Sequence, residues 1–308
     1  MNTQLNIKQL IEQYLAETDF MPTTLRTYGE VLYYFWRWAT ANGIDINNPR
    51  RSDVIQWKRY LRDEKGNKPS TIDLYISSLK GFFRWLEQEG IYKNIASNIR
   101  SENRQKSLRK RILLPEQIKK ILSDIDTTTL IGKRDKALIT TIYTNGLRRI
   151  EAQRIKLADI DTSDNMISIQ GKGHNDKIRV PVADQNIELI NDYIQARVDS
   201  GENVNNDSPL FVSYVNHNIF PPALKPDSIS AIIKQRIKAS GYHGEGITAH
   251  SLRHSIAVQI LEKGNSLYDV TVFLRHKSAD TSRIYTRYIE EKKAANRAIR
   301  ISMTNDIF

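Results

Sequence analysis

The stretch MISIQGKGHNDKIRVP, residues 166–181, decides the fold class of this 308-residue chain. Ile167 and Ile169 alternate with polar residues, and Ile178 and Val180 do the same beyond a glycine-bearing turn. Alternation with a period of two on both sides of such a turn is typical of a β-hairpin. The sequence therefore predicts a small antiparallel sheet whose hairpin has a basic tip.

Helical patterns surround this hairpin. Apolar residues recur at helical spacing in residues 116–124, 134–143, 187–198, 228–239, 251–263, 267–274 and 281–290. Gly264 directly follows one of these runs, and a glycine in that place is typical of a helix end. The second part of the chain is therefore mixed, with many helices and one hairpin.

The first hundred residues are helical throughout. Shorter helices are expected at residues 7–15 and 54–61, and Ser70 after Pro69 stands where a helix N-cap is expected. Two longer apolar stripes predict helices that bury one face in a core. They consist of Leu25, Tyr28, Leu32, Phe35, Trp36 and Ala39, and of Ile72, Tyr75, Ile76, Leu79, Phe82, Phe83 and Leu86.

A basic stretch joins the two parts. Between residues 100 and 111 hardly any apolar residue occurs, and Glu102 alone opposes Arg100, Arg104, Lys106, Arg109, Lys110 and Arg111. Such a run is typical of a linker. The fold class we predict is mainly α with a small β-sheet (α+β). A helical domain at 1–98 precedes a basic linker at 99–112 and a mixed α/β domain at 113–308.

The composition favours a polyanionic partner. The chain carries 46 Lys and Arg against 35 Asp and Glu, a net charge of +11, and so basic a surface points first to DNA or RNA. It has no cysteine, which excludes disulfides and thiolate chemistry. No apolar run is long enough to span a bilayer, and the N-terminus lacks the layout of a signal peptide. We expect a cytoplasmic protein with no membrane partner.

Several chemistries lack their sequence patterns. No glycine-rich loop ends in Lys-Ser or Lys-Thr, which argues against a nucleoside triphosphatase. His250 and His254 have the spacing of metal ligands on a helix, but no third ligand is evident. Asp159, Asp161 and Asp164 do not have the spacing of a calcium loop and are interpreted as turn residues. We expect neither a cofactor nor a metal.

Four segments carry the remaining candidate chemistry. In chain order they are Gly146-Leu147-Arg148-Arg149-Ile150-Glu151, the hairpin tip Gly171-Lys172-Gly173, His250-Ser251-Leu252-Arg253-His254, and Leu274-Arg275-His276 followed nine residues later by Tyr285. Each segment alone is weak evidence. Together and in this order they resemble the signature of the tyrosine recombinase, or phage integrase, family, of the compact Xer-like or transposon type. The helical first part is similar to that family's core-binding domain in pattern more than in motif.

The resemblance implies a site-specific DNA recombinase that cuts and rejoins strands through a 3′-phosphotyrosine, without ATP or metal. Tyr285 is the implied nucleophile, and Arg148 and Arg253 are the implied clamp on the phosphate oxygens. Two guanidiniums suit this task because they form forked hydrogen bonds to phosphate. The family's general base falls on His250 and its general acid on Lys172, while His276 is expected to hydrogen-bond the phosphate.

Two of these roles have rivals, and two positions depart from the family pattern. Tyr288 competes with Tyr285 because it lies on nearly the same helix face, although the spacing from His276 favours Tyr285. Lys177 competes with Lys172, which the family motif favours because it stands between two glycines. Arg275 replaces the family's usual glycine, and Arg149 stands where a small or apolar residue is usual.

The resemblance also implies partners and an architecture. The two domains are expected to clamp double-stranded DNA at specific recombination sites, and four protomers are expected because two duplexes require four cuts. Accessory or directionality proteins are further candidate partners. The tail with Ala294, Ala295, Ala298, Ile299 and Ile301 would pack on its own domain or, as in the family, on a neighbouring protomer. Three alternatives stay open: a DNA-binding regulator that has lost catalysis, a topoisomerase of type IB and, least favoured, a metal-dependent transposase.

Overall fold

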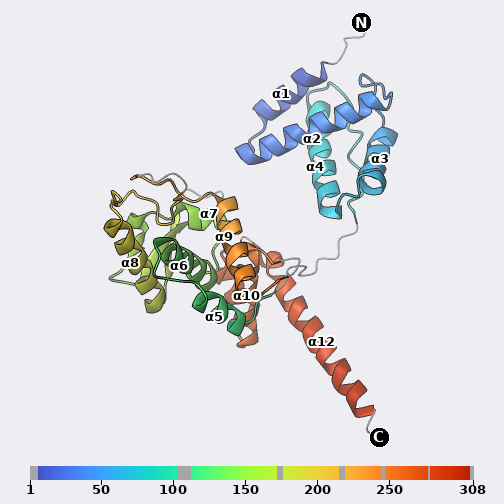
Figure 1. The fold of residues 1–308 in the computed structure, drawn as a ribbon. Helices are drawn as coiled ribbons and strands as arrows, with labels where there is room; N and C mark the ends of the chain where they lie inside the picture. The colour runs from blue at the N-terminus through green and yellow to red at the C-terminus, as the bar shows by residue number, and fades with distance from the viewer. Residues whose placement is uncertain are drawn as a thin grey trace. The chain divides into compact units, whose positions relative to one another are not determined.

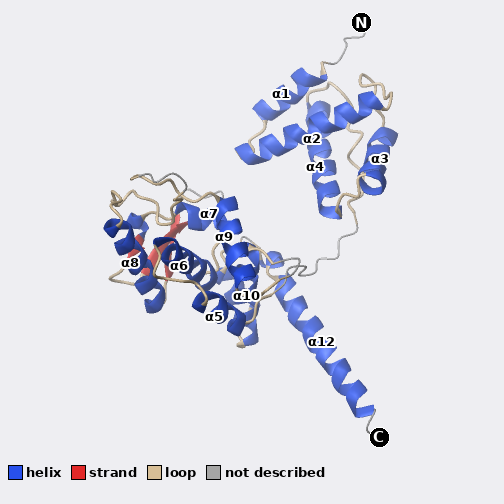
Figure 2. Cartoon of the chain, viewed as in Figure 1, coloured by secondary structure: helices blue, strands red, loops and turns tan. Residues whose placement is uncertain are grey.

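The computed structural model describes residues 6–102, 112–171, 176–214, 219–243, 247–276 and 278–305. The chain divides into two compact units, Met1–Gln105 and Lys106–Phe308 (Figure 1). Helices dominate both, and the strands lie in the second unit only, as far as the described residues show (Figure 2). The predicted fold class, mainly α with a small sheet, is confirmed.

The first unit is built from helices around one aromatic core. Its elements are α1 (Ile7–Glu17), α2 (Pro22–Ala41), α3 (Arg51–Arg59) continued by a π-helical turn (Tyr60–Glu64), and α4 (Pro69–Gln88). Most residues of the stripes on α2 and α4 are buried as predicted, and Phe35, Phe82 and Phe83 are fully inaccessible. Leu25, Tyr28 and Tyr75 are half-buried. Hydrophobic burial on this scale supplies the main favourable free energy of folding for the unit.

One local prediction in this unit is wrong. Pro69, not a residue after Ser70, is the first helical residue of α4, so Lys68 holds the N-cap position. The physical reason is that proline suits the first position of a helix, where its missing N–H has no helical partner to lose.

The second unit contains the sheet and the remaining helices. Its helices are α5 (Pro115–Ser123), α6 (Leu130–Thr144), α7 (Arg149–Arg154), α8 (Asp184–Asp199), α9 (Pro226–Ala239), α10 (Ala249–Glu262), α11 (Leu267–Phe273) and α12 (Arg283–Asn305). Gly264, with φ of 90°, follows the end of α10 as predicted. Helix α6 is buried on nearly all sides and packs against α8 and α10, which makes it the centre of the core.

The predicted hairpin is confirmed. Strands β2 (Met166–Gln170) and β3 (Lys177–Pro181) pair antiparallel, with Ile167 opposite Val180 and Ile169 opposite Ile178. Ile167 and Ile169 are buried against the core, whereas Ile178 is 51% exposed. The hairpin tip with Lys172 lies outside the described residues.

A short strand that the sequence did not predict, β1 (Ile160–Asp161), completes the sheet in the order β1-β2-β3. It leads into the turn that contains Asp164. The Asp161 carboxylate accepts hydrogen bonds from the backbone of Ser163 and Asp164, and Arg179 of β3 pairs with both aspartates. The interpretation as turn residues is confirmed for Asp161 and Asp164. It is wrong for Asp159, which ends a short 3-10 helix (Leu157–Asp159) and whose buried carboxylate pairs with Lys177.

The described residues contain neither a candidate membrane span nor a candidate metal site. In this part of the chain no helix is both long and apolar enough to cross a membrane. Within the same ranges, no group of three His, Asp or Glu side chains is placed to hold a metal ion.

Candidate active site

Tyr285 lies in the first turn of α12 and is buried, with 1% of its surface exposed. It shares a small core with Val258 of α10 and with Val270 and Leu274 of the α11 region. Tyr288, its rival in the sequence, packs against the edge of the same core. The packing of α10, α11 and α12 therefore fixes the position of the Tyr285 ring.

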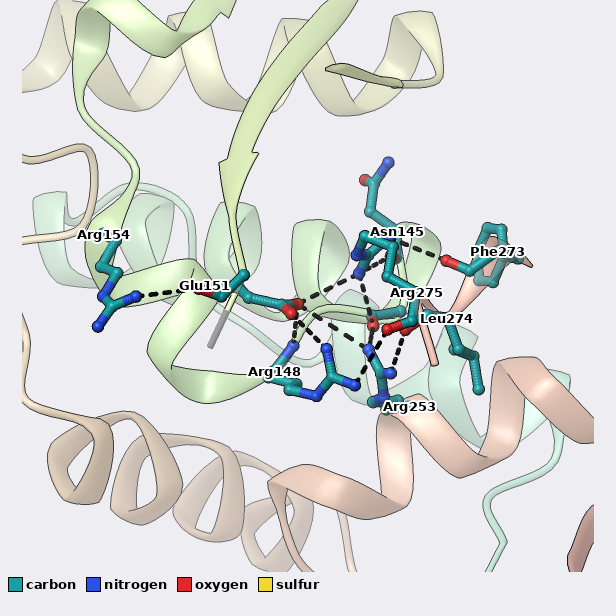
Figure 3. A network of polar contacts seen from close by, with 10 residues as sticks. Asn145, Arg148, Glu151, Arg154, Arg253, Phe273, Leu274 and Arg275 are labelled. Atoms are coloured by element: carbon teal, nitrogen blue, oxygen red, sulfur yellow. Dashed lines mark hydrogen bonds and ion pairs between the residues drawn. The ribbon is translucent and has the colours of Figure 1, made fainter. Parts of the chain in front are cut away.

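The backbones of two loops hold Arg148 and Arg253. Arg148 immediately precedes α7, and Arg253 lies inside α10. The Arg253 guanidinium donates to the carbonyl oxygens of Gly146 and Leu274. The Arg148 guanidinium donates to the carbonyl of Arg275 over 3.3 Å (Figure 3). The loop after α11 thus orients both guanidiniums through two successive carbonyl groups.

Glu151 is fully buried and joins these arginines into one network (Figure 3). Its carboxylate accepts from Arg148 at 2.6 Å and from Arg275 at 3.2 Å, and lies 3.9 Å from Arg253. Burial opposes ionisation of Glu151, but the charge of Arg275 and the hydrogen bonds from Arg148 outweigh it and lower the carboxyl pKa. One buried anion therefore balances part of the charge of three cations.

Arg275, which replaces the family's glycine, keeps the left-handed backbone that a glycine adopts without strain. Its φ is 54°, a conformation that costs other residues roughly 1–2 kcal/mol. Its guanidinium turns inward and donates to the carbonyls of Phe273, Gly146 and Asn145 as well as to Glu151. Arg275 therefore ties the loop after α11 to the start of α7.

His276 is a neutral imidazole beside Tyr285. Its Nδ1 lies 2.7 Å from the Ser282 hydroxyl, and its ring is nearly parallel to that of Tyr285 at 6.5 Å between centroids. Burial, reinforced by the charges of Arg253 and Arg148, lowers the pKa of His276 to about 4. At neutral pH the ring can therefore both donate and accept a hydrogen bond.

A second imidazole contacts Tyr285 directly. Nδ1 of His254 lies 2.8 Å from the Tyr285 hydroxyl, and the ring of His250, one turn earlier on α10, stacks on His254 at 5.8 Å. Burial raises the pKa of Tyr285 to about 12, although Arg253 and Arg148 oppose the rise. The phenol is therefore protonated at neutral pH.

The structure brings together five of the six residues singled out in the sequence. Arg148, His250, Arg253, His276 and Tyr285 come from the start of α7, from α10, from the loop after α11 and from the start of α12. Lys172 lies outside the described residues. Its rival Lys177 forms an ion pair with the buried carboxylate of Asp159 at the base of β3.

Sequence reasoning missed two contributors and left a third unexplained. His254 was rejected as a metal ligand and given no other role, and nothing in the sequence indicated that Arg275 turns inward. Arg149 donates to the Ser230 hydroxyl over 2.6 Å and lies 3.3 Å from the carboxylate of Asp227. It therefore joins α7 to α9 and has a structural explanation.

Comparisons with known proteins show the family of the chain. Residues 111–292 match the phage integrase family, and residues 7–90 match the N-terminal SAM-like domain of phage integrases. The tyrosine recombinase XerD of Listeria monocytogenes is 31% identical over 289 residues, which cover 91% of this chain and 94% of that protein. The tyrosine recombinase XerA of Thermococcus onnurineus is 29% identical, with 95% and 96% covered.

Solved structures share the fold. The XerH recombinase bound to a palindromic difH substrate superposes with a TM-score of 0.73 at 24% identity, covering 97% of this chain and 91% of that one. The lambda integrase tetramer bound to a Holliday junction gives 0.68 at 18% identity, covering 92% and 78%. The chain therefore belongs to the phage integrase family and is a site-specific DNA recombinase of the tyrosine type.

Proposed function

We propose that this recombinase cleaves DNA by attack of Tyr285 on a backbone phosphate, forming a 3′-phosphotyrosine that a second strand end then resolves. The observation that carries the proposal is the position of the Tyr285 phenol. It is hydrogen-bonded to an imidazole and close enough to Arg253 and Arg148 for their charges to act on its pKa. A covalent link of this kind conserves the energy of the phosphodiester bond, so no nucleoside triphosphate is needed.

Arg148 and Arg253 would bind the nonbridging oxygens of the scissile phosphate. Negative charge grows on these oxygens as the phenol attacks, and donors that are already oriented stabilise it at no further reorganisation cost. The carbonyls of Gly146, Leu274 and Arg275 and the carboxylate of Glu151 supply that orientation. His276, which is neutral at neutral pH and lies near the phenol, would add a hydrogen bond to the phosphate.

DNA must gain access to these groups before they can act. The Arg148 side chain is 28% exposed, but that of Arg253 is only 3% exposed and Tyr285 is almost inaccessible. We therefore infer that DNA binding displaces part of the polypeptide that covers Arg253 and Tyr285. Lys172 is the proposed general acid for the leaving 5′-oxygen. The resemblance implies this role, and the ion pair with Asp159 that engages its rival Lys177 supports it.

The helical domain, proposed at 1–98, would bind the duplex through its basic surface. A hollow on this unit is lined by Arg51, Lys58, Arg59, Arg62 and Arg100 among other residues. Arg59 and Arg62 are exposed, so they are available to a phosphate backbone. Contacts of this kind release counterions and give affinity with little dependence on sequence.

We further propose that four protomers assemble on two DNA sites, because each chain offers one nucleophile for one of four cuts. The lambda integrase tetramer on a Holliday junction shares the fold and supports this count. In the tail, Ala294 and Ala295 of α12 are exposed and so are available to a neighbouring copy. The side chains of Ala298, Ile299 and Ile301 lie outside the description.

The proposal is tested by comparing the wild type with Tyr285→Phe and Tyr288→Phe in cells. Each protein is isolated from cells lysed in strong denaturant, and DNA still attached is sequenced. Attached DNA is expected with the wild type and Tyr288→Phe, and none with Tyr285→Phe. Equal recovery with Tyr285→Phe would refute the assignment of the nucleophile.

A further inference from the structure

We propose that His254 is a catalytic residue, the base that takes the proton from Tyr285 as the phenol attacks. This inference rests on the proposed function of Tyr285. It differs from the resemblance, which places the general base at His250. The Tyr285 hydroxyl and Nδ1 of His254 are 2.8 Å apart, within the range required of a general base and its proton.

Before DNA binds, the packing on both sides holds this contact in place. His254 directly follows Arg253, whose guanidinium bonds to two loop carbonyls, so this turn of α10 is fixed. The next residue, Ser255, accepts a hydrogen bond from the backbone of Leu113 and donates to the carbonyl of Ser251. On the other side the Tyr285 ring is enclosed in its small apolar core.

The other imidazoles are placed for different tasks. The ring of His276 is nearly parallel to that of Tyr285, inclined by 9° at 6.5 Å between centroids, and its Nδ1 contacts Ser282 and not the phenol hydroxyl. The ring of His254 is inclined by 56° at 5.5 Å and directs a nitrogen at the hydroxyl. His250 stacks on His254 and so adjoins the proposed acceptor.

The Tyr285 O–H bond breaks and its proton passes to Nδ1 of His254, which becomes an imidazolium. The phenol oxygen forms a bond to phosphorus, the bond from phosphorus to the 5′-oxygen breaks, and that oxygen takes a proton from the general acid. The acceptor role requires that the neutral His254 ring carry its proton on Nε2, because Nδ1 must offer a lone pair.

The bound phosphate would make this transfer favourable only on DNA. Without DNA, Arg253 and Arg148 already bring positive charge to this pocket, and after burial their charges are the next causes of the low pKa of His276. A new imidazolium there is disfavoured by like charge. A phosphodiester brings a compensating negative charge, so His254 becomes a competent base when the substrate is in place.

The test compares His254→Gln and His254→Ala with the wild type and with His243→Gln, which changes an exposed histidine outside the site. The probe is a nicked duplex that carries the DNA segment recovered with the wild type from cells. Single-turnover formation of the covalent complex is expected to fall by roughly 10²–10⁴-fold, the usual contribution of a general base, with DNA binding retained. His243→Gln should match the wild type.

Rescue separates a base from a merely structural residue. Added imidazole should restore covalent complex formation by His254→Ala, and more strongly basic substituted imidazoles should restore more. Replacing Tyr285 by a difluorotyrosine, whose phenol ionises more readily, should shrink the defect of His254→Gln. Unchanged or faster cleavage by His254→Gln, or rescue of His250→Ala in place of His254→Ala, would overturn the proposal.

The outcomes keep the two proposals distinct. If Tyr285→Phe still forms the covalent complex, the proposed function itself is wrong. If Tyr285→Phe forms no covalent complex but His254→Gln forms it at the normal rate, only the role of His254 is wrong. A measurement without DNA adds a further check. Nitrogen-15 NMR should show the Nε2-protonated tautomer of His254, and a proton found on Nδ1 would contradict the acceptor role.

Discussion

Arg275→Gly restores the residue that the family usually has at this position, and we expect it to destabilise this protein. The substitution relieves the left-handed backbone at φ 54°. It also removes a guanidinium whose side chain is only 11% exposed and which donates to Phe273, Asn145, Gly146 and Glu151. The sign of the change therefore depends on which of the two effects is larger.

The magnitudes favour the lost contacts. Relief of the left-handed strain contributes roughly 1 kcal/mol. Hydrogen bonds to a charged group contribute about 1.5–3 kcal/mol each. Four oxygens lose the Arg275 guanidinium as a donor, but the Gly146 carbonyl still accepts from Arg253. Glu151 keeps Arg148 and Arg253 as partners, so the loss stays below the roughly 3–5 kcal/mol of a fully broken buried pair. The net expectation is a loss of about 2 kcal/mol.

The assay is denaturant unfolding followed by two signals. All four tryptophans, Trp36, Trp38, Trp57 and Trp85, lie in the first unit, so their fluorescence serves as an internal reference. Far-UV circular dichroism also follows the second unit, whose transition should move to lower denaturant. Arg275→Ala removes the same contacts without relieving the backbone and should be less stable than Arg275→Gly by roughly 1 kcal/mol. A glycine variant as stable as the wild type would refute this account of the arginine.

Three further results are expected. Because the unfolded chain binds a proton on His276 at an ordinary pKa near 6.5 while the folded site holds that pKa at about 4, stability should fall as the pH drops from about 6.5 to 4. His276→Asn should flatten that dependence in acid unfolding curves, and an equally steep curve would contradict it. Arg59→Ala combined with Arg62→Ala should weaken DNA binding and reduce the salt slope by about one per lost phosphate contact; an unchanged slope would remove this surface from the DNA interface. Covalent cleavage should continue in excess EDTA, and loss that magnesium restores would contradict the tyrosine mechanism.

Local patterns made most of the fold predictable. The hairpin at β2 and β3 follows from apolar and polar residues that alternate along each strand. The helical stripes follow from apolar residues that recur every three or four positions. Strand β1 has two residues and is too short for any period to be visible. The start of α4 was misplaced because Pro69 and Ser70 each provide a local start signal, and the proline's fixed backbone prevailed.

The candidate site was predictable in composition but not in its contacts. The ordered motifs named Arg148, Arg253, His276 and Tyr285, and their roles stay predictions. The contact between His254 and Tyr285 depends on how α10 and α12 are rotated against each other. The sequence pattern of either helix alone does not determine that rotation. The inward turn of Arg275 depends likewise on a carbonyl of Gly146, which lies far away along the chain.

The most direct test of the central claim is to locate the DNA attachment on the protein itself. Wild-type protein trapped on DNA in cells is digested with nuclease and protease, and mass spectrometry identifies the peptide that retains a nucleotide. We predict a nucleotide joined through its 3′-phosphate to Tyr285. A nucleotide on Tyr288 or any other residue, or one joined through its 5′-phosphate, would contradict the mechanism.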